Sequence, residues 1–205
     1  MTIIRLTGLL ASVILMVTAG PVAAITVDDT RDYTNGGADT YFIPPPTADV
    51  PNPETVPPYY RYRDQDWDWA HSAIGGAISA ASLTITAWDV DNATGDSTPD
   101  FEIDSIQIKS GLTWHTLGNL AGASNEFSDT TFDLSGWFSE VNAGLMVRIL
   151  IDRDLTYPPF WGVSLDKSVL SVTTDLNPVP VPAAVWLFAT ALAGLAGFSR
   201  RKTNT

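Results

Sequence analysis

The residues with the clearest chemical content are six carboxylates within residues 89–104, a stretch of 16 residues without lysine or arginine. They are Asp89, Asp91, Asp96, Asp100, Glu102 and Asp104. Carboxylates at this density repel one another unless a cation neutralises them or water separates them. Calcium suits such a stretch because it binds about six to eight oxygen atoms in flexible geometry. These residues therefore leave two interpretations open, a calcium site and a solvated acidic turn.

Residues that would support catalysis are few. The two histidines, His71 and His115, belong to no Gly-x-Ser-x-Gly elbow and no His-x-x-x-His metal motif. His71 follows three aspartates, which permits an Asp–His pair, but a histidine held in place by structural hydrogen bonds is the favoured interpretation. The chain has no cysteine, which excludes zinc–thiolate, iron–sulfur and cysteine-nucleophile chemistry. We therefore assign no catalytic residue.

Trp88 is the candidate for contact with a ligand. Side chains alternate between the two faces of a strand, so Trp88 is expected to point away from the face that carries Leu83 and Ile85. An outward tryptophan offers a large apolar ring that stacks on a sugar. Most of the other tryptophans of the domain are assigned to the core.

Short β-strands are the elements that must position these residues. Apolar residues alternate with other residues in five runs, at 83–88, 101–104, 131–134, 147–152 and 169–173. Glycine, asparagine, aspartate and proline lie between the runs, which is typical of antiparallel strands. The predicted fold is all-β, an antiparallel β-sandwich of Greek-key or jelly-roll type over residues 64–176, with roughly six to nine strands.

The same alternation predicts how the carboxylates lie. Phe101 and Ile103 are the apolar members of the second run, which puts Glu102 and Asp104 together on the opposite face. Asp89 and Asp91 share a face for the same reason. Two strand ends are therefore expected to bring four carboxylates together.

Residues 25–63 lack this alternation and are predicted to form a proline-rich irregular arm. Seven prolines lie within residues 44–58, and proline removes a backbone donor and favours extended backbone. Aromatic residues flank the prolines: Tyr41, Phe42, Tyr59, Tyr60 and Tyr62. A stalk or surface-hugging arm is favoured over an aromatic platform for sugar.

The charge of the chain limits its partners. Residues 25–177 hold all 23 acidic residues but only seven of the 11 basic residues, which gives this part a net charge of −16. Nucleic acid and anionic lipid are polyanions and are therefore unsuitable partners. Cations and neutral partners such as sugars are favoured.

Both ends of the chain have the pattern of export signals. Residues 1–24 combine an early arginine, an apolar run and small closing residues, which is typical of a secretory signal peptide. Residues 183–198 are uncharged and would form a helix of roughly 24 Å, slightly short for a bilayer core. The cations that follow, Arg200, Arg201 and Lys202, indicate a cytoplasmic C-terminus.

The C-terminal residues 177–205 resemble the PEP-CTERM sorting signal of Gram-negative bacteria. The resemblance rests on the following residues: Val179, Pro180, Val181, Pro182, Ala183, Ala184, Trp186, Leu187, Phe188, Arg200, Arg201 and Lys202. The name-giving Pro-Glu-Pro reads Pro180-Val181-Pro182 here. The resemblance implies export with the help of signal peptidase, transient anchoring in the inner membrane, and recognition by an exosortase. It also implies a final place at the cell surface or in a biofilm matrix.

A second resemblance covers about residues 65–174. Short pieces such as Trp67-Asp68-Trp69-Ala70-His71 and Trp161-Gly162-Val163-Ser164-Leu165-Asp166 are similar to a β-rich domain that recurs in PEP-CTERM proteins. This resemblance implies no particular activity.

The function expected from the sequence is that of an exported, non-enzymatic surface or matrix protein. Its sandwich, stabilised by calcium, would interact with extracellular polysaccharide. The alternatives are a glycan-active hydrolase that uses carboxylates of the domain, and a purely structural matrix protein without a ligand.

Overall fold

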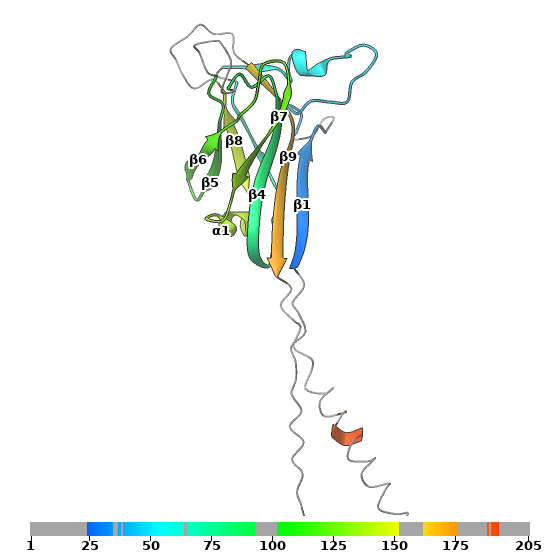
Figure 1. Ribbon diagram of the computed structural model, residues 1–205, viewed down its shortest axis with the longest axis vertical. Coiled ribbons are helices and arrows are strands. Elements are labelled where there is room, and N and C mark those ends of the chain that lie inside the picture. The colour runs from blue at the N-terminus through cyan, green and yellow to red at the C-terminus, as the bar shows by residue number, and fades with distance from the viewer. Residues whose placement is uncertain are drawn as a thin grey trace, which may run out of the picture.

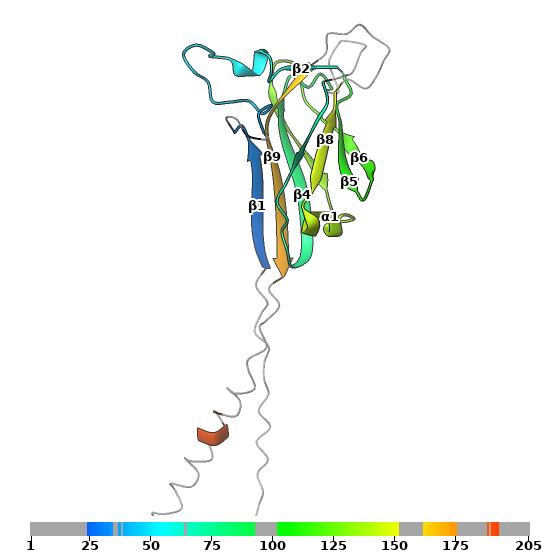
Figure 2. The same cartoon turned by 180° about the vertical axis from the view of Figure 1, so that it is seen from behind.

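Two antiparallel β-sheets packed face to face form the domain (Figures 1 and 2). The computed structural model describes residues 24–34, 37, 39–63, 65–92, 102–151, 162–175, 188 and 190–192. The first sheet has the order β1 (Ala24–Asp32), β9 (Gly162–Asp175), β4 (Ala77–Trp88) and β7 (Phe127–Asp133), and the short β2 (Arg61–Tyr62) also pairs with β9. The second sheet has the order β3 (Trp67–Ala70), β8 (Met146–Leu150), β5 (Ser105–Ser110) and β6 (Thr113–Asn119). The predicted all-β antiparallel sandwich is confirmed at this level.

The alternation read from the sequence places the core between the sheets. Leu83 of β4 pairs with Leu170 of β9, and both side chains are fully buried. Val147 and Ile149 of β8 are fully buried from the other sheet. Each such side chain contributes about 1.5–3 kcal/mol through burial. The inward residues of these runs were therefore identified correctly from their spacing.

The run at residues 101–104 is the exception. The strand β5 begins only at Ser105, and Ile103 is partly exposed whereas Glu102 and Asp104 are 1% and 0% exposed. The prediction that Ile103 points inward on a strand is therefore wrong. The cause is the backbone before β5, which belongs to neither sheet, so the alternation of a paired strand does not govern these three residues.

Residues 25–63 differ from the expected irregular arm in their first part. β1 pairs with β9 over its whole length, from Ala24 opposite Asp175 to Asp32 opposite Lys167. The sequence of β1 did not indicate a strand because backbone pairing with β9, rather than apolar side chains, holds this edge strand in place. Phe42, farther along, is fully buried in the core.

The two ends of the sandwich carry different elements. A short helix, α1 (Phe138–Ala143), buries Val141 and lies at the end where β1 begins (Figure 1). We call residues 44–58 the proline segment; it includes the 3₁₀ helix η1 (Pro53–Thr55). The proline segment lies at the opposite end of the sandwich (Figures 1 and 2). Ala24 and Asp175 pair far from it, at the end near α1.

Candidate binding site

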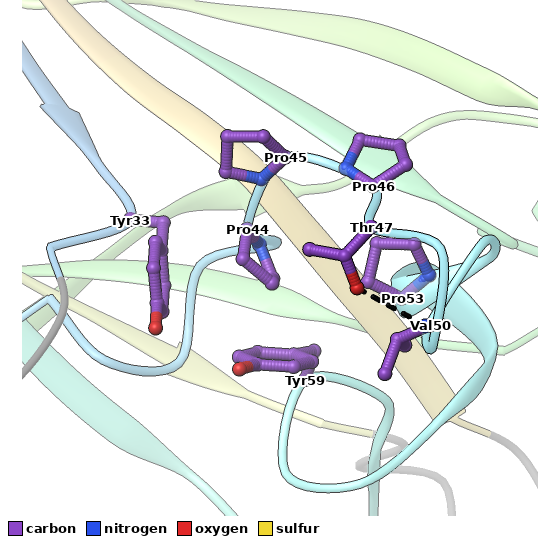
Figure 3. A pocket seen from close by; sticks show the side chains of 8 residues that line it. All are labelled: Tyr33, Pro44, Pro45, Pro46, Thr47, Val50, Pro53 and Tyr59. Atoms are coloured by element: carbon purple, nitrogen blue, oxygen red, sulfur yellow. Dashed lines mark hydrogen bonds between the residues drawn. The ribbon is translucent and has the colours of Figure 1, made fainter.

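A pocket lined by tyrosines and prolines lies where the proline segment meets the end of β1 (Figure 3). It has a volume of about 420 Å³, which is within the usual range of ligand sites. Its lining residues are Tyr33, Pro44, Pro45, Pro46, Thr47, Val50, Pro53 and Tyr59. We call this hollow the tyrosine pocket.

The two tyrosine rings determine what the tyrosine pocket can bind. The rings of Tyr33 and Tyr59 lie edge to face, with centroids 5.9 Å apart and planes at 82°. Burial, together with the neighbouring Tyr33, raises the pKa of Tyr59, so this hydroxyl remains neutral at ordinary pH. Neutral phenols donate and accept hydrogen bonds, and their rings offer apolar faces. This combination can pack on an apolar ring and exchange hydrogen bonds with hydroxyl groups.

Contacts with the sandwich hold the proline segment in place. The backbone N–H of Ile43 donates to the carbonyl of Leu165 at 2.8 Å, directly after the buried Phe42. The hydroxyl of Ser164 donates to the carbonyl of Glu54 at 2.7 Å. The segment is thus tied to β9 before and within its run of prolines. Because prolines have few accessible conformations, a ligand would pay little entropy to order this wall of the pocket.

Local hydrogen bonds shape the far wall of the tyrosine pocket. The backbone N–H of Thr47 donates to the carbonyl of Val50 at 3.0 Å. The N–H of Val50 in turn donates to the Thr47 hydroxyl at 3.1 Å, as Figure 3 shows. The N–H of Tyr59 donates to the carbonyl of Val56 at 3.1 Å. These turns return the chain so that Tyr59 lies across from Tyr33.

Trp88, the predicted stacking residue, lies beside this region but outside the pocket. It pairs with Ser164 and Phe127 on the outer face of the first sheet, as its alternation predicts, and is partly exposed. Its ring stands edge to face with Tyr60, at 5.8 Å between centroids. Trp88 is not among the residues that line the tyrosine pocket. Its contact with Tyr60 instead supports the chain directly after the proline segment.

Four of the predicted metal ligands lie directly after β4 and directly before β5. The N–H of Glu102 donates to the carbonyl of Asp91 at 3.3 Å, so the two chain segments do meet as expected. Four of the six carboxylates are largely buried there: Asp89, Asp91, Glu102 and Asp104 are 8%, 6%, 1% and 0% exposed. Asp96 and Asp100 lie outside the described residues.

The surroundings of these carboxylates do not identify an ion. Asp89 accepts hydrogen bonds from the Tyr60 hydroxyl at 2.8 Å and from the N–H of Asn125 at 2.7 Å. Asp91, Glu102 and Asp104 each have interaction partners in the folded chain. In the part of the chain that the structure describes, no group of three or more acidic or histidine side chains is arranged to hold a metal. Calcium therefore stays a prediction.

His71 joins the two sheets through a chain of polar groups. Its Nδ1 lies 3.1 Å from Oδ2 of Asp29 on β1, and its Nε2 lies 2.9 Å from Oγ of Ser168 on β9. Burial lowers the pKa of His71, so the ring is neutral at ordinary pH. Since a carboxylate only accepts, Nδ1–H donates to Asp29 and Nε2 accepts from Ser168. The predicted Asp–His pair therefore exists, but with Asp29 rather than with an aspartate at 64, 66 or 68.

This order of groups matches a serine-hydrolase triad, but its burial favours a structural role. Ser168 is 0% exposed and His71 is 2% exposed, so the hydroxyl has no surface that a substrate could reach. We interpret the three residues as a satisfied polar link inside the core.

The sorting motif lies almost entirely outside the described residues. Phe188 is the one member within them; it is helical and 68% exposed. Among the residues that the structure describes, no helix is long and apolar enough to cross a membrane.

Of the five aromatic residues that flank the prolines, only Tyr59 lines the tyrosine pocket. Phe42 is in the core, and Tyr60 packs on Trp88. Tyr33, which completes the pocket, was missed by sequence reasoning. It follows β1 and lies far from the prolines in the sequence, and no pattern in the sequence connects it to them.

Comparison with known proteins adds no family. No family model and no curated protein matches the chain. A solved dimer of the Tobacco streak virus coat protein is similar at 13% identity, covering 77% of this chain and 90% of that chain with a TM-score of 0.32. A second crystal form of that coat protein has 13% identity, covers 62% of this chain and 93% of that chain, and has a TM-score of 0.27. At these TM-scores we draw nothing from the likeness.

Proposed function

We propose that this is an exported, exosortase-sorted protein of the cell surface or extracellular matrix that binds extracellular polysaccharide and catalyses no reaction. The observation that carries the binding function is the tyrosine pocket, a hollow of about 420 Å³ with Tyr33 and Tyr59 in its wall. The proposal of export rests on the signal-like residues 1–24 and on the PEP-CTERM-like tail. Calcium is proposed to stabilise the sandwich.

The chemistry of the tyrosine pocket supports a saccharide as its ligand. Sugar rings present apolar C–H faces that pack on aromatic rings, and hydroxyls that pair with phenols. Prolines provide a rigid wall that needs no ordering on binding. The acidic charge of the chain, −12 overall, disfavours nucleic acid.

We further propose that the sandwich is of jelly-roll type, between a signal helix at residues 1–24 and a membrane helix in residues 177–205. The strand orders β1-β9-β4-β7 and β3-β8-β5-β6 support this type, because a jelly roll has eight strands in two four-stranded sheets. The C-terminal helix would hold the protein in the inner membrane until exosortase processes it.

Binding is tested with extracellular polysaccharide from the cells that make the protein. The exported protein and its Tyr33→Ala and Tyr59→Ala variants are compared by affinity electrophoresis in gels that contain the polysaccharide. Each variant should bind about tenfold more weakly, since about 1.4 kcal/mol of lost ring contact changes affinity by that factor. Tyr62→Ala is the control, because Tyr62 is 36% exposed and lies outside the pocket lining.

Two results would contradict the proposed function. The polysaccharide would fail to retard the unaltered protein, or the Tyr62 variant would lose as much affinity as the pocket variants. New reducing ends in the polysaccharide after incubation would contradict the absence of catalysis.

A further inference from the structure

A second hollow adjoins the tyrosine pocket. It has a volume of about 330 Å³ and shares four residues of its lining with the tyrosine pocket, namely Pro44, Pro45, Pro46 and Pro53. Its other lining residues are Asp32, Ile43, Pro51, Glu54, Phe127 and Asp166. We call this hollow the acidic pocket. The two pockets are therefore neighbours on the same proline segment.

The acidic pocket differs from the tyrosine pocket in charge. Asp32 comes from the end of β1, Glu54 from η1 and Asp166 from β9, so three separate elements each contribute an acidic residue to its lining. Neither lining contains a lysine, arginine or histidine. Burial raises the pKa of Asp166, and the nearby Asp32 and Asp129 raise it further. Lys167 lowers this pKa, but by less than burial raises it. The pocket therefore has an excess of negative charge in partly buried surroundings.

The spacing of the carboxylates favours an organic cation over a metal ion. Calcium requires several oxygens at about 2.3–2.6 Å from one point. In the described part of the chain, no three acidic side chains are arranged in this way, and those of the acidic pocket are no exception. Carboxylates spread around a hollow of about 330 Å³ suit an ammonium group that is carried on a larger molecule.

We infer that the two pockets form one site for a saccharide with free amino groups, in which the sugar ring packs against Tyr33 and Tyr59 and an ammonium group lies beside Asp32 and Asp166. The inference rests on the proposed function, which it narrows from polysaccharide in general to a cationic, amino-bearing one. N-acetylation removes the positive charge that these carboxylates attract. A uronic acid carries a negative charge and would be repelled.

The inference is tested by measuring the affinity of the exported protein for three oligosaccharides of equal length. These are oligomers of glucosamine, of N-acetylglucosamine and of galacturonic acid, measured by calorimetry at about pH 6 and low salt. The glucosamine oligomer should bind about tenfold more tightly than the N-acetylated one. This preference should shrink at high salt, because salt ions screen the charge of Asp32, which is exposed.

Variants assign the preference to the acidic pocket. Asp32→Asn combined with Asp166→Asn should remove the preference for free amino groups, measured as the ratio of the affinities for the glucosamine and N-acetylated oligomers. Asp28→Asn is the matched control, because Asp28 lies exposed on the same strand as Asp32 but outside both linings. It should retain the preference. Thermal melting of each variant shows whether it is folded.

The possible results separate this inference from the proposed function. Equal affinity for the glucosamine and N-acetylated oligomers, with loss of binding in Tyr59→Ala, overturns the inference and leaves polysaccharide binding intact. Tighter binding of the galacturonate oligomer has the same consequence. A preference that survives in the Asp32 and Asp166 double variant also overturns the inference. If no saccharide binds, including the polysaccharide of the producing cells, both proposals fail.

Discussion

Three residues from three strand regions form the polar link between the sheets. Asp29 accepts hydrogen bonds from His71 at 3.1 Å and from the backbone N–H of Ser72 at 2.7 Å, and Arg31 lies 3.3 Å away. Both ring nitrogens of His71 and the hydroxyl of Ser168 thus find partners, which offsets the cost of removing them from water. The order Asp29–His71–Ser168 can therefore serve to stabilise the fold without any catalytic role. The burial of Ser168 supports this structural interpretation.

Replacing His71 with Asn tests this role through the pH dependence of stability. The variant should lose about 1–3 kcal/mol at pH 7.5, because Asp29 or Ser168 loses a buried partner. The pKa of His71 is lowered from 6.5, so folding favours the neutral ring. Its contribution is present above pH 6.5 and is lost as the pH falls below that value. The free energy of unfolding, measured with urea at pH 7.5 and 5.5, should therefore fall more in the unaltered protein than in the variant.

His115→Asn is the matched control for this measurement. His115 lies on β6 beside Trp137, at 5.1 Å between ring centroids, and is only half-buried. Its variant should keep the pH dependence of the unaltered protein. An identical dependence in the His71 variant would contradict the role given to His71.

At the scale of elements, the buried carboxylates between β4 and β5 require partners that compensate for their loss of hydration. Glu102 and Asp104 enter the end of the sandwich directly before β5, where the backbone belongs to neither sheet. Buried carboxylates are costly unless they are neutralised or well hydrogen-bonded. Hydrogen-bond partners within the chain can offset this cost, and so can a bound calcium ion. Only a calcium ion would be removed by a chelator.

Thermal melting with calcium and with chelator distinguishes these two ways. If calcium binds, millimolar calcium should raise Tm by several degrees, since an ion at about 100 times its Kd adds about 2.7 kcal/mol. Glu102→Gln should reduce this rise. Asp49→Asn should not, because Asp49 is exposed in the proline segment. Equal Tm values for the unaltered protein in calcium and in chelator would remove calcium from the proposal.

At the scale of the whole molecule, the two pockets lie at the opposite end of the sandwich from the pair of Ala24 and Asp175. β1 runs from Ala24, paired with Asp175, to Asp32 in the lining of the acidic pocket. A strand of nine residues spans roughly 30 Å. If the C-terminal helix anchors the protein as proposed, the proline segment, at the opposite end of the sandwich from Asp175, would lie away from the membrane (Figure 1).

Removing residues 177–205 tests this division of roles. Because β9 ends at Asp175, the shortened protein should keep its Tm within about 1 °C and keep its affinity for polysaccharide. It should be released into the soluble periplasmic fraction instead of remaining with the membrane fraction. Immunoblots of both fractions, together with thermal melting of the released protein, measure these outcomes. A lower Tm would show that the tail contributes to the fold, and unchanged retention would contradict its role as an anchor.

Much of the sandwich, but little of the candidate site, was predictable from the sequence. The inward residues of β4, β8 and β9 follow from alternation, because a strand turns successive side chains to opposite faces. β1 was not predictable, since its pairing with β9 is a backbone contact between distant parts of the chain. The partners of His71 were hidden for the same reason: Asp29 and Ser168 lie 42 and 97 positions away.

The sequence by itself determined which side chains of β4, β8 and β9 face the core, the acidic charge of the domain and the pattern of its terminal segments. Each of these depends on the composition of the chain or on local backbone geometry, and both can be inferred from residues that are adjacent in the sequence. Only the tertiary structure decided that Tyr33 and Tyr59 line one pocket and that Asp32 and Asp166 line the next. These juxtapositions arise because β1 and the proline segment both dock on β9, and contacts between distant segments have no local sequence pattern.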